Sequence, residues 1–358
     1  MNRFIVSFSR LSRAVFMVGV AALLTSLAVS AHAAPVIDWV TVGDPGNAAD
    51  TDPAGYGAVA TSFQIMKYEW TNSQYTDFLN SVDPSGTNPN SVYNTSMGSN
   101  ARGGISFTSG ATSGSKYAVK TNMGDKPVNY VSWFDAARVS NWLMNGATGT
   151  SSTETGAYTL NNSTSGSAPA VNPGATFYVP TEDQQYKAAY YKGGSTNAGY
   201  WNYATQSDTA PTAVTSGTTG IGSASNGTIG SGTGNFANYK KAADWGSPVQ
   251  DGNVTTVGTN GGASAYGAFD MSGNLYEWND LTGAASRERG VQGGYWGNTD
   301  AGALSSSGGY PDGPSGEGSD YGFRLAAPVA VPEPSTYAMA LAGLACGGYV
   351  VVRRRKRA

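Results

Sequence analysis

The stretch Ala265–Asp280 reads AYGAFDMSGNLYEWND and decides how the chain is interpreted. It places two carboxylates, Asp270 and Glu277, on either side of a Ser-Gly-Asn turn. A turn at this point lets both carboxylates and the backbone carbonyls between them converge. Hard oxygen ligands in a flexible loop suit Ca²⁺, which takes about six to eight oxygens. A β-turn flanked by two solvated acids fits the same spacing, so spacing alone leaves both interpretations open.

A second group of oxygen-bearing residues precedes this stretch. Asn238 and Asp251 lie near Asn253 in a polar segment. Taken alone, this segment is read as an ordinary polar loop.

Histidine and cysteine are confined to the two ends of the 358-residue chain, as His32 and Cys346. Residues 34–331 therefore lack the groups for Ser-His-Asp or Cys-His catalysis, for disulfides, and for zinc, copper or non-haem iron sites. The chain has 21 Lys and Arg residues, eight of them in the two ends, and 24 Asp and Glu residues, one of them in the ends. The middle therefore carries 13 basic and 23 acidic residues, a net charge of −10. This charge argues against binding of nucleic acid.

The composition indicates a loop-rich globular domain with a core of large rings. Gly accounts for 49 residues, charged residues for only 13%, and aromatic residues for 11%. A disordered chain would be poor in aromatic residues. No internal repeat or second linker is apparent, so residues 34–330 are expected to form one domain.

Residues 1–33 are typical of a secretory signal peptide. Three Arg precede an apolar run, Ala14–Val29, and small residues flank His32 before the expected cleavage at Ala34. An uncleaved N-terminal anchor is the alternative.

Residues 331–358 contain three parts in order: Val331-Pro332-Glu333-Pro334, an apolar run at 336–352, and a basic end at 353–357. The apolar run spans about 26 Å as a helix, slightly short of the hydrocarbon layer. The basic end should stay cytoplasmic and leave the domain outside. The order resembles the PEP-CTERM sorting tail, which implies recognition by an exosortase, a Gram-negative bacterium, and export to the cell surface or extracellular matrix. A plain single-pass anchor is the alternative.

Three helices and several short strands are expected in the middle. Alternation over 61–69 predicts a strand, and a stripe of Tyr75, Phe78, Leu79 and Val82 predicts a helix over 73–82. Ser132 with Asp135, and Thr181 with Gln184, are capping boxes that predict helices ending near Gly146 and Tyr191. A short strand is expected over 177–179, a long loop with short strands over 83–124, and polar loops over 147–175 and 193–236.

Six blocks of the middle, in order over residues 63–327, resemble the formylglycine-generating enzyme, or sulfatase-modifying factor, family. They are YEWTNSQY from Tyr68, PVNYVSWFDAA from Pro127, VPTE from Val179, YGAFDMSGNLYEW from Tyr266, GGYW from Gly293 and GFRLA from Gly322. The resemblance implies an α+β, irregular and loop-rich fold related to C-type lectins.

The resemblance also implies two calcium sites. In the first, Asp270 and Glu277 would supply side-chain oxygens, and Gly273 and Leu275 carbonyls. In the second, Asn238 and Asp251 would supply side chains, and Tyr239 and Asn253 carbonyls.

The departures from the family concern catalysis. The active family enzyme holds copper(I) with two cysteines between the GGSW and GFR blocks, and the interval 297–321 here contains none. No copper site is therefore expected. Gln184-Gln185 replaces the family's Glu-Trp, Gln292 its Arg, and Tyr295 its Ser.

The sequence therefore predicts an exported, non-catalytic domain that binds polysaccharide or surface proteins through exposed rings. The candidate binding residues are Trp201, Trp245, Tyr295 and Trp296, although each of these rings can equally belong to the core. An enzyme using oxygen-ligand or paired-carboxylate chemistry and a purely structural sheath component are the alternatives. Exosortase, exopolysaccharide and surface proteins are the expected partners, with membrane contact through the C-terminal helix before processing.

Overall fold

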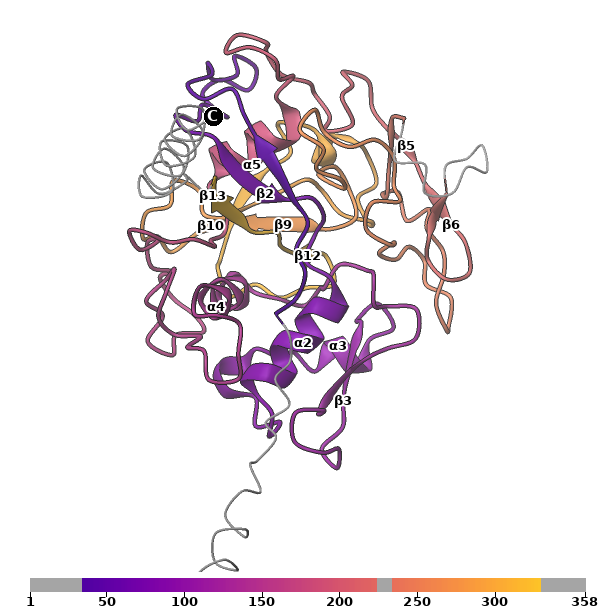
Figure 1. Ribbon diagram of the computed structural model, residues 1–358. Coiled ribbons are helices and arrows are strands. Elements are labelled where there is room, and N and C mark those ends of the chain that lie inside the picture. Colours follow the sequence, from indigo (N-terminus) through magenta and orange to yellow (C-terminus); the bar gives the residue numbers. More distant parts are fainter. Residues whose placement is uncertain (1–33, 224–233, 330–358) are drawn as a thin grey trace, which may run out of the picture. The chain divides into compact units, whose positions relative to one another are not determined.

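The computed structural model describes residues 34–223 and 234–329. The expected signal peptide and sorting tail lie outside these residues. The described part combines short strands and helices with long connections (Figure 1). Its helices are α2 (Asn72–Val82), α3 (Ser96–Ser99), α4 (Trp133–Met144) and α5 (Glu182–Tyr190), with two 3₁₀ turns, η1 (Pro89–Ser91) and η2 (Gly302–Leu304). No helix among the described residues is long and apolar enough to cross a membrane.

Two sheets organise the domain. β1 (Trp39–Val42), β2 (Phe63–Met66) and β13 (Ala326–Pro328) form an antiparallel sheet with β2 in the centre. β11 (Tyr310–Asp312), β10 (Arg289–Gln292), β9 (Tyr276–Asn279) and β12 (Tyr321–Gly322) form the second, in which β12 pairs with β9 in parallel. The smaller pairs are β3 (Ile105–Phe107) with β4 (Tyr117–Val119), β5 (Thr212–Ala213) with β8 (Phe236–Ala237), and β6 (Thr215–Ser216) with β7 (Gly222–Ser223).

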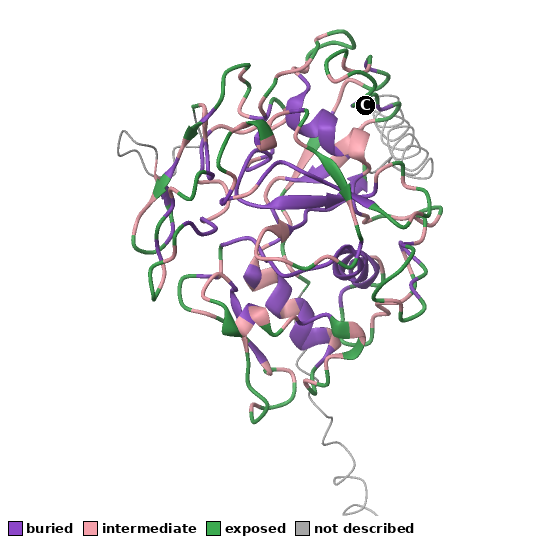
Figure 2. Cartoon of the chain, turned by 180° about the vertical axis from the view of Figure 1, so that it is seen from behind, coloured by how far each residue is buried: buried purple, intermediate pink, exposed green. Residues whose placement is uncertain are grey.

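The two expected capping boxes, at Ser132 and Thr181, are confirmed, and Thr71 forms a third. Thr71, Ser132 and Thr181 each accept a hydrogen bond from the backbone N–H three residues on. The helices α2, α4 and α5 begin at the following residue in each case, because the cap satisfies one of the N–H groups that a helix leaves free. Helix α4 is buried on all sides from Trp133 to Leu143 (Figure 2).

The strand predicted over 61–69 is shorter, because pairing of β2 ends at Met66. Both of its faces are buried: Phe63 and Ile65 pack with Tyr186 and Tyr190 of α5, while Met66 packs in the larger core. Residues 177–179 make only an isolated bridge, between Tyr178 and Ala326, and no strand. The larger core contains Trp70, Trp133, Trp142 and Trp278, all fully buried, which confirms a core of large rings.

Candidate functional site

The turn predicted between Asp270 and Glu277 is present. Asp270, Gly273 and Asn274 all have positive φ, of 59°, 90° and 69°. Gly273 is required here, because a Cβ atom would lie 2.6 Å from the carbonyl oxygen of Asn238. The turn therefore lies directly against Asn238, a member of the second predicted set.

Asn274, which is not among the predicted ligands, joins the two predicted sets. Its N–H donates to the carbonyl of Asn238, and its Oδ1 accepts from the side chain of Asn238 and from the backbone of Thr255. Its Nδ2 donates to Glu69 at 2.7 Å. The signal available in the sequence was its place in the Ser-Gly-Asn turn, since Asn tolerates left-handed backbone and bonds to nearby backbone groups.

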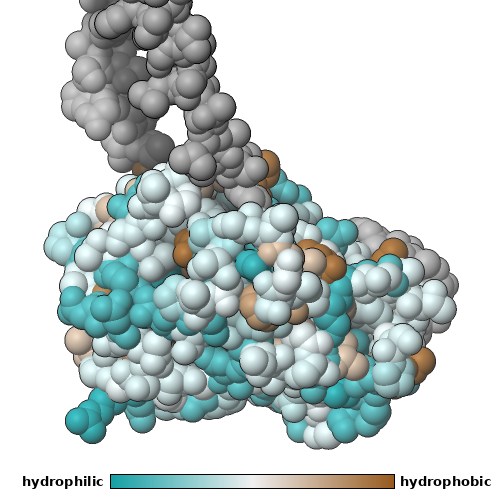
Figure 3. All heavy atoms as spheres, turned by 90° about the horizontal axis from the view of Figure 1, so that it is seen from below, coloured by the Kyte–Doolittle hydropathy of each residue, from teal (hydrophilic) through white to brown (hydrophobic). Residues whose placement is uncertain are grey.

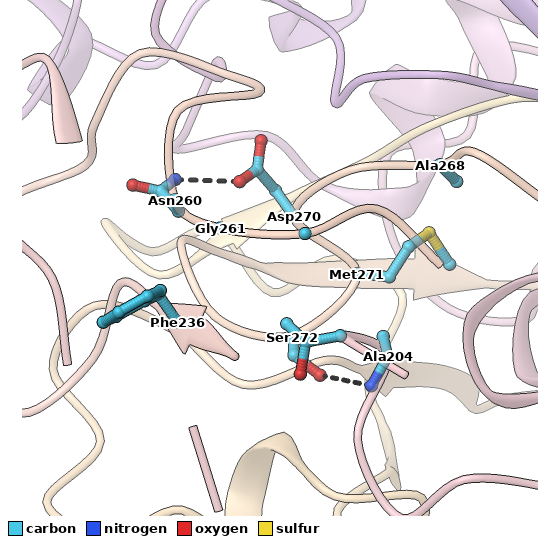
Figure 4. Close-up of a pocket in the computed structure, with 10 residues that line it drawn as sticks. Ala204, Phe236, Asn260, Gly261, Ala268, Asp270, Met271 and Ser272 are labelled. Atoms are coloured by element: carbon cyan, nitrogen blue, oxygen red, sulfur yellow. Dashed lines mark hydrogen bonds between the residues drawn. The ribbon is translucent and has the colours of Figure 1, made fainter. Parts of the chain in front are cut away.

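Asp270 has its own partners within the protein (Figure 4). Its carboxylate accepts from the backbone of Gly258 at 2.5 Å and from the Nδ2 of Asn260 at 2.8 Å. Burial raises the pKa of Asp270, and these hydrogen bonds act in the opposite direction. The cavity beside it, lined also by Ser272 and Phe236, has essentially no room for a water molecule.

Glu277 is bound by a guanidinium. Arg324 donates to both of its oxygens, at 2.6 Å from Nε and 2.5 Å from Nη2, and Gln185 donates to Oε2 at 3.1 Å. The side chains of Arg324 and Glu277 are 0% and 2% exposed. Gln185, which departs from the family pattern, also accepts from Asn279, so it links α5 to β9.

A third carboxylate, Glu69, lies close to this pair. It is fully buried, its Oε2 accepts from Asn274, and its Oε1 has no hydrogen-bond partner among the described residues. Burial, and then the charges of Asp270 and Glu277, raise its pKa well above the ordinary value. The three carboxylates and Arg324 thus form one buried electrostatic cluster.

The first calcium set does not fit a cation as these side chains lie. Both oxygens of Glu277 face Arg324, and a calcium ion at that position would lie beside a positive guanidinium. Calcium binding there requires Glu277 to leave its partner.

The second set is only partly brought together. Asn238 is fully buried, and its Oδ1 lacks a partner among the described residues, which suits a ligand oxygen. The carboxylate of Asp251, however, pairs with Lys241 at 3.1 Å, and its side chain is 77% exposed. The carbonyl of Asn253 already accepts from the Nδ2 of Asn238. Tyr239 is buried, and its hydroxyl donates to Pro211. Among the described residues, no three His, Cys, Asp or Glu side chains are grouped to hold a metal.

The four predicted ligand-binding rings have different environments. Trp245 and Trp296 are buried, and their indole N–H groups donate to the carbonyls of Val254 and Ser319. Trp201 is half-buried beneath the ammonium of Lys192, 4.3 Å from its ring. Tyr295 is half-buried and belongs to a cluster of rings.

That cluster, here called the tyrosine patch, comprises Tyr276, Tyr295, Tyr310 and Tyr321. The ring of Tyr276 contacts the other three at centroid distances of 5.5, 5.4 and 6.4 Å. Tyr310 is 39% exposed, one of the few large side chains that reach solvent to this extent. The hydroxyl of Tyr321 donates to Asp312 at 2.6 Å, which puts a carboxylate at the edge of the rings. Apart from Tyr276, the patch comes from the interval 293–321.

Little apolar surface is exposed on the face that Figure 3 shows, where hydrophobic residues occur as small scattered groups. The polar residues there are consistent with the Ser, Thr and Asn content of the chain. Tyr310 is thus an exposed ring within a group of rings that has a carboxylate at its edge.

Comparison with known proteins agrees with the sequence blocks. The family profile described as Sulfatase-modifying factor enzyme 1-like domain matches residues 40–329, and the PEP-CTERM protein-sorting motif matches residues 330–356. No curated protein matches the chain. Among solved structures, CarF is similar at 22% identity and a TM-score of 0.46, with 82% of this chain and 99% of CarF covered.

Two further solved structures are similar to the chain. The variable protein 1 of Treponema denticola is 16% identical at a TM-score of 0.41, with 82% of this chain and 94% of that protein covered. PvdO from Pseudomonas aeruginosa is 18% identical at a TM-score of 0.37, with 82% of this chain and 92% of PvdO covered.

Proposed function

The chain belongs to the Sulfatase-modifying factor enzyme 1-like domain family and carries a PEP-CTERM sorting motif, and from this premise we propose that it is a non-catalytic binding protein of the cell surface or extracellular matrix. The sorting motif is typical of exported proteins that an exosortase processes. The ligand in this proposal is a polysaccharide of the matrix, and the tyrosine patch is the surface that binds it.

The exposure of Tyr310 within the tyrosine patch carries the proposal. Aromatic rings stack on the apolar faces of sugars, and neighbouring carboxylates and amides accept hydrogen bonds from sugar hydroxyls. Asp312 is held at the ring edge by Tyr321, and the Nδ2 of Asn298 donates to the hydroxyl of Tyr276. These polar groups are positioned before any ligand arrives, which lowers the entropic cost of binding.

The non-catalytic part of the proposal is supported by composition. Cys346, which lies in the tail, is the single cysteine of the chain, so residues 34–330 offer no thiolate for copper(I). Carboxylate chemistry is the remaining enzymatic alternative, and turnover of polysaccharide would favour it.

The test is retention of the purified protein on the exopolysaccharide of the producing organism. We expect the protein to be retained and to be released by soluble polysaccharide. If the protein passes through unretained and instead forms concentration-dependent polymers without glycan, the proposal is wrong and a structural sheath role is favoured.

A further inference from the structure

A second surface feature is a pocket of about 100 Å³ at the beginning of α5. The loop before β2 supplies Tyr56, helix α5 supplies Glu182 and Tyr186, and the segment from the end of β10 to β11 supplies Gln292, Ser306 and Ser307. The volume corresponds to roughly three water molecules at ~30 Å³ each. It therefore admits a small polar group and the atoms next to it.

Glu182 is the charged group of this pocket, and it has no counter-ion. Its side chain is half-buried and makes no hydrogen bond or ion pair with any residue in the described ranges. Burial, and then the charge of Asp183, raise its pKa. No Lys or Arg is among the described residues that line the pocket. The site thus presents an uncompensated carboxylate, which favours a cationic group.

Gln292 adds unused hydrogen-bonding capacity. The residue is 4% exposed, and its Oε1 has no partner among the described residues. Its Nε2 reaches the carbonyl of Ser306 only at 3.5 Å, which is long for a hydrogen bond.

Two rings complete the pocket. Tyr56 is 37% exposed and stacks on Tyr186, with 5.6 Å between ring centroids. The hydroxyl of Tyr186 donates to the carboxylate of Asp50 at 2.7 Å. This hydrogen bond fixes the ring of Tyr186 and places a further carboxylate nearby. Ring faces attract cations through their quadrupole.

We propose that this pocket binds a primary ammonium group, and that the group is carried by a hexosamine unit with a free amine in the matrix polysaccharide. An ammonium has three N–H donors and no acceptor, which matches a carboxylate, a carboxamide oxygen and serine hydroxyls. The source of the ammonium rests on the proposed polysaccharide-binding function, whereas the pocket itself is separate from the tyrosine patch.

The experiment is calorimetric titration of the purified full chain with glucosamine, glucose and N-acetylglucosamine, below neutral pH so that the amine is protonated. We expect glucosamine to bind, and the two neutral sugars to bind at least about tenfold more weakly, because they lack the charged donor. Glu182→Gln should weaken glucosamine binding about tenfold or more, and Tyr56→Leu should weaken it to a smaller extent. Glu288→Gln removes one acid at an exposed position outside the pocket and should leave binding unchanged.

Three results would overturn the proposal. The first is equal binding of glucosamine to the wild type and to Glu182→Gln. The second is tighter, Glu182-dependent binding of a lysine amide than of glucosamine, which would assign the pocket to a protein partner. The third is an absence of glucosamine binding. If Glu182→Gln then also leaves retention on exopolysaccharide unchanged, the pocket is refuted while the proposed function stands. Glucosamine binding without retention would refute the proposed function alone.

Discussion

The guanidinium of Arg324 binds Glu277 at both carboxylate oxygens, with Nε 2.6 Å from Oε2 and Nη2 2.5 Å from Oε1. Arg324 also donates to the carbonyls of Met66 and Phe269. One side chain from the segment before β13 therefore connects β2, the stretch before the Asp270 turn, and β9. Of the residues that the sequence suggested as calcium ligands, Glu277 is therefore held by an arginine.

Replacing Arg324 should destabilise the domain strongly. In Arg324→Met, Glu277 keeps a buried charge without its partner, and loss of one member of a buried pair typically costs about 3–5 kcal/mol. Urea unfolding measures this. The double variant Arg324→Met, Glu277→Gln should lose less than the sum of the two single variants, because Glu277 is then no longer a buried charge without its partner. Additive losses would contradict the ion pair.

The calcium prediction is tested with metal-free protein. An ion bound only by the folded state raises the unfolding free energy, by about 2.7 kcal/mol at a hundredfold excess over the dissociation constant. The family resemblance predicts that calcium raises the melting temperature and that Glu277→Gln reduces this rise. A melting temperature that neither calcium nor chelator changes would refute it and leave Arg324 as the cation that neutralises Glu277.

Asp135 should make stability depend on pH. Burial, and then the charge of Glu317, raise the pKa of Asp135 from 3.8 to about 7. The folded state then holds a proton that the unfolded state has lost, so this contribution to stability is complete below pH 4 and is lost as the pH rises to about 7. Asp135→Asn should flatten the dependence of the melting temperature on pH between about pH 4 and pH 7. The surface substitution Glu288→Gln should leave that dependence unchanged. An unchanged slope in Asp135→Asn would contradict the assignment.

Tyr310 should matter for binding more than for stability. Aromatic contacts are worth about 0.5–1.5 kcal/mol, so Tyr310→Ala should weaken retention on exopolysaccharide about threefold or more. Phe107 is a matched control, because it is 38% exposed and packs against Tyr93 and Tyr117 in a similar way. Equal effects of Tyr310→Ala and Phe107→Ala on retention would show that the tyrosine patch has no special role.

Local signals in the sequence predicted the helices well. Ser132 with Asp135 and Thr181 with Gln184 act over three residues, so the chain positions them without help from distant segments. The same signals could not predict that α4 is buried on every side, because burial depends on which segments pack against the helix. Residues 177–179 show a local signal that failed. A strand was expected there, but Tyr178 makes only an isolated bridge with Ala326.

The candidate site divides in the same way. The turn at Gly273 and Asn274 followed from residue type, because few other residues adopt left-handed backbone. The partners of Asp270, Glu277 and Asp251 did not follow from residue type, because a carboxylate can accept a hydrogen bond from an arginine, a lysine or an amide, or can coordinate a metal. The identity of the partner depends on which group the fold places within about 3 Å.

The sequence by itself determined the family, the sorting motif, the absence of cysteine and histidine from residues 34–330, and the starts of the helices. Each of these depends on residue identity or on spacing along a few neighbours. Only the tertiary structure decided that Arg324 is the partner of Glu277, that Tyr310 joins an exposed group of rings, and that Glu182 lies without a partner in a pocket with Gln292. These pairings join residues 34 to 110 positions apart, and at such separations packing, rather than local propensity, fixes which groups meet.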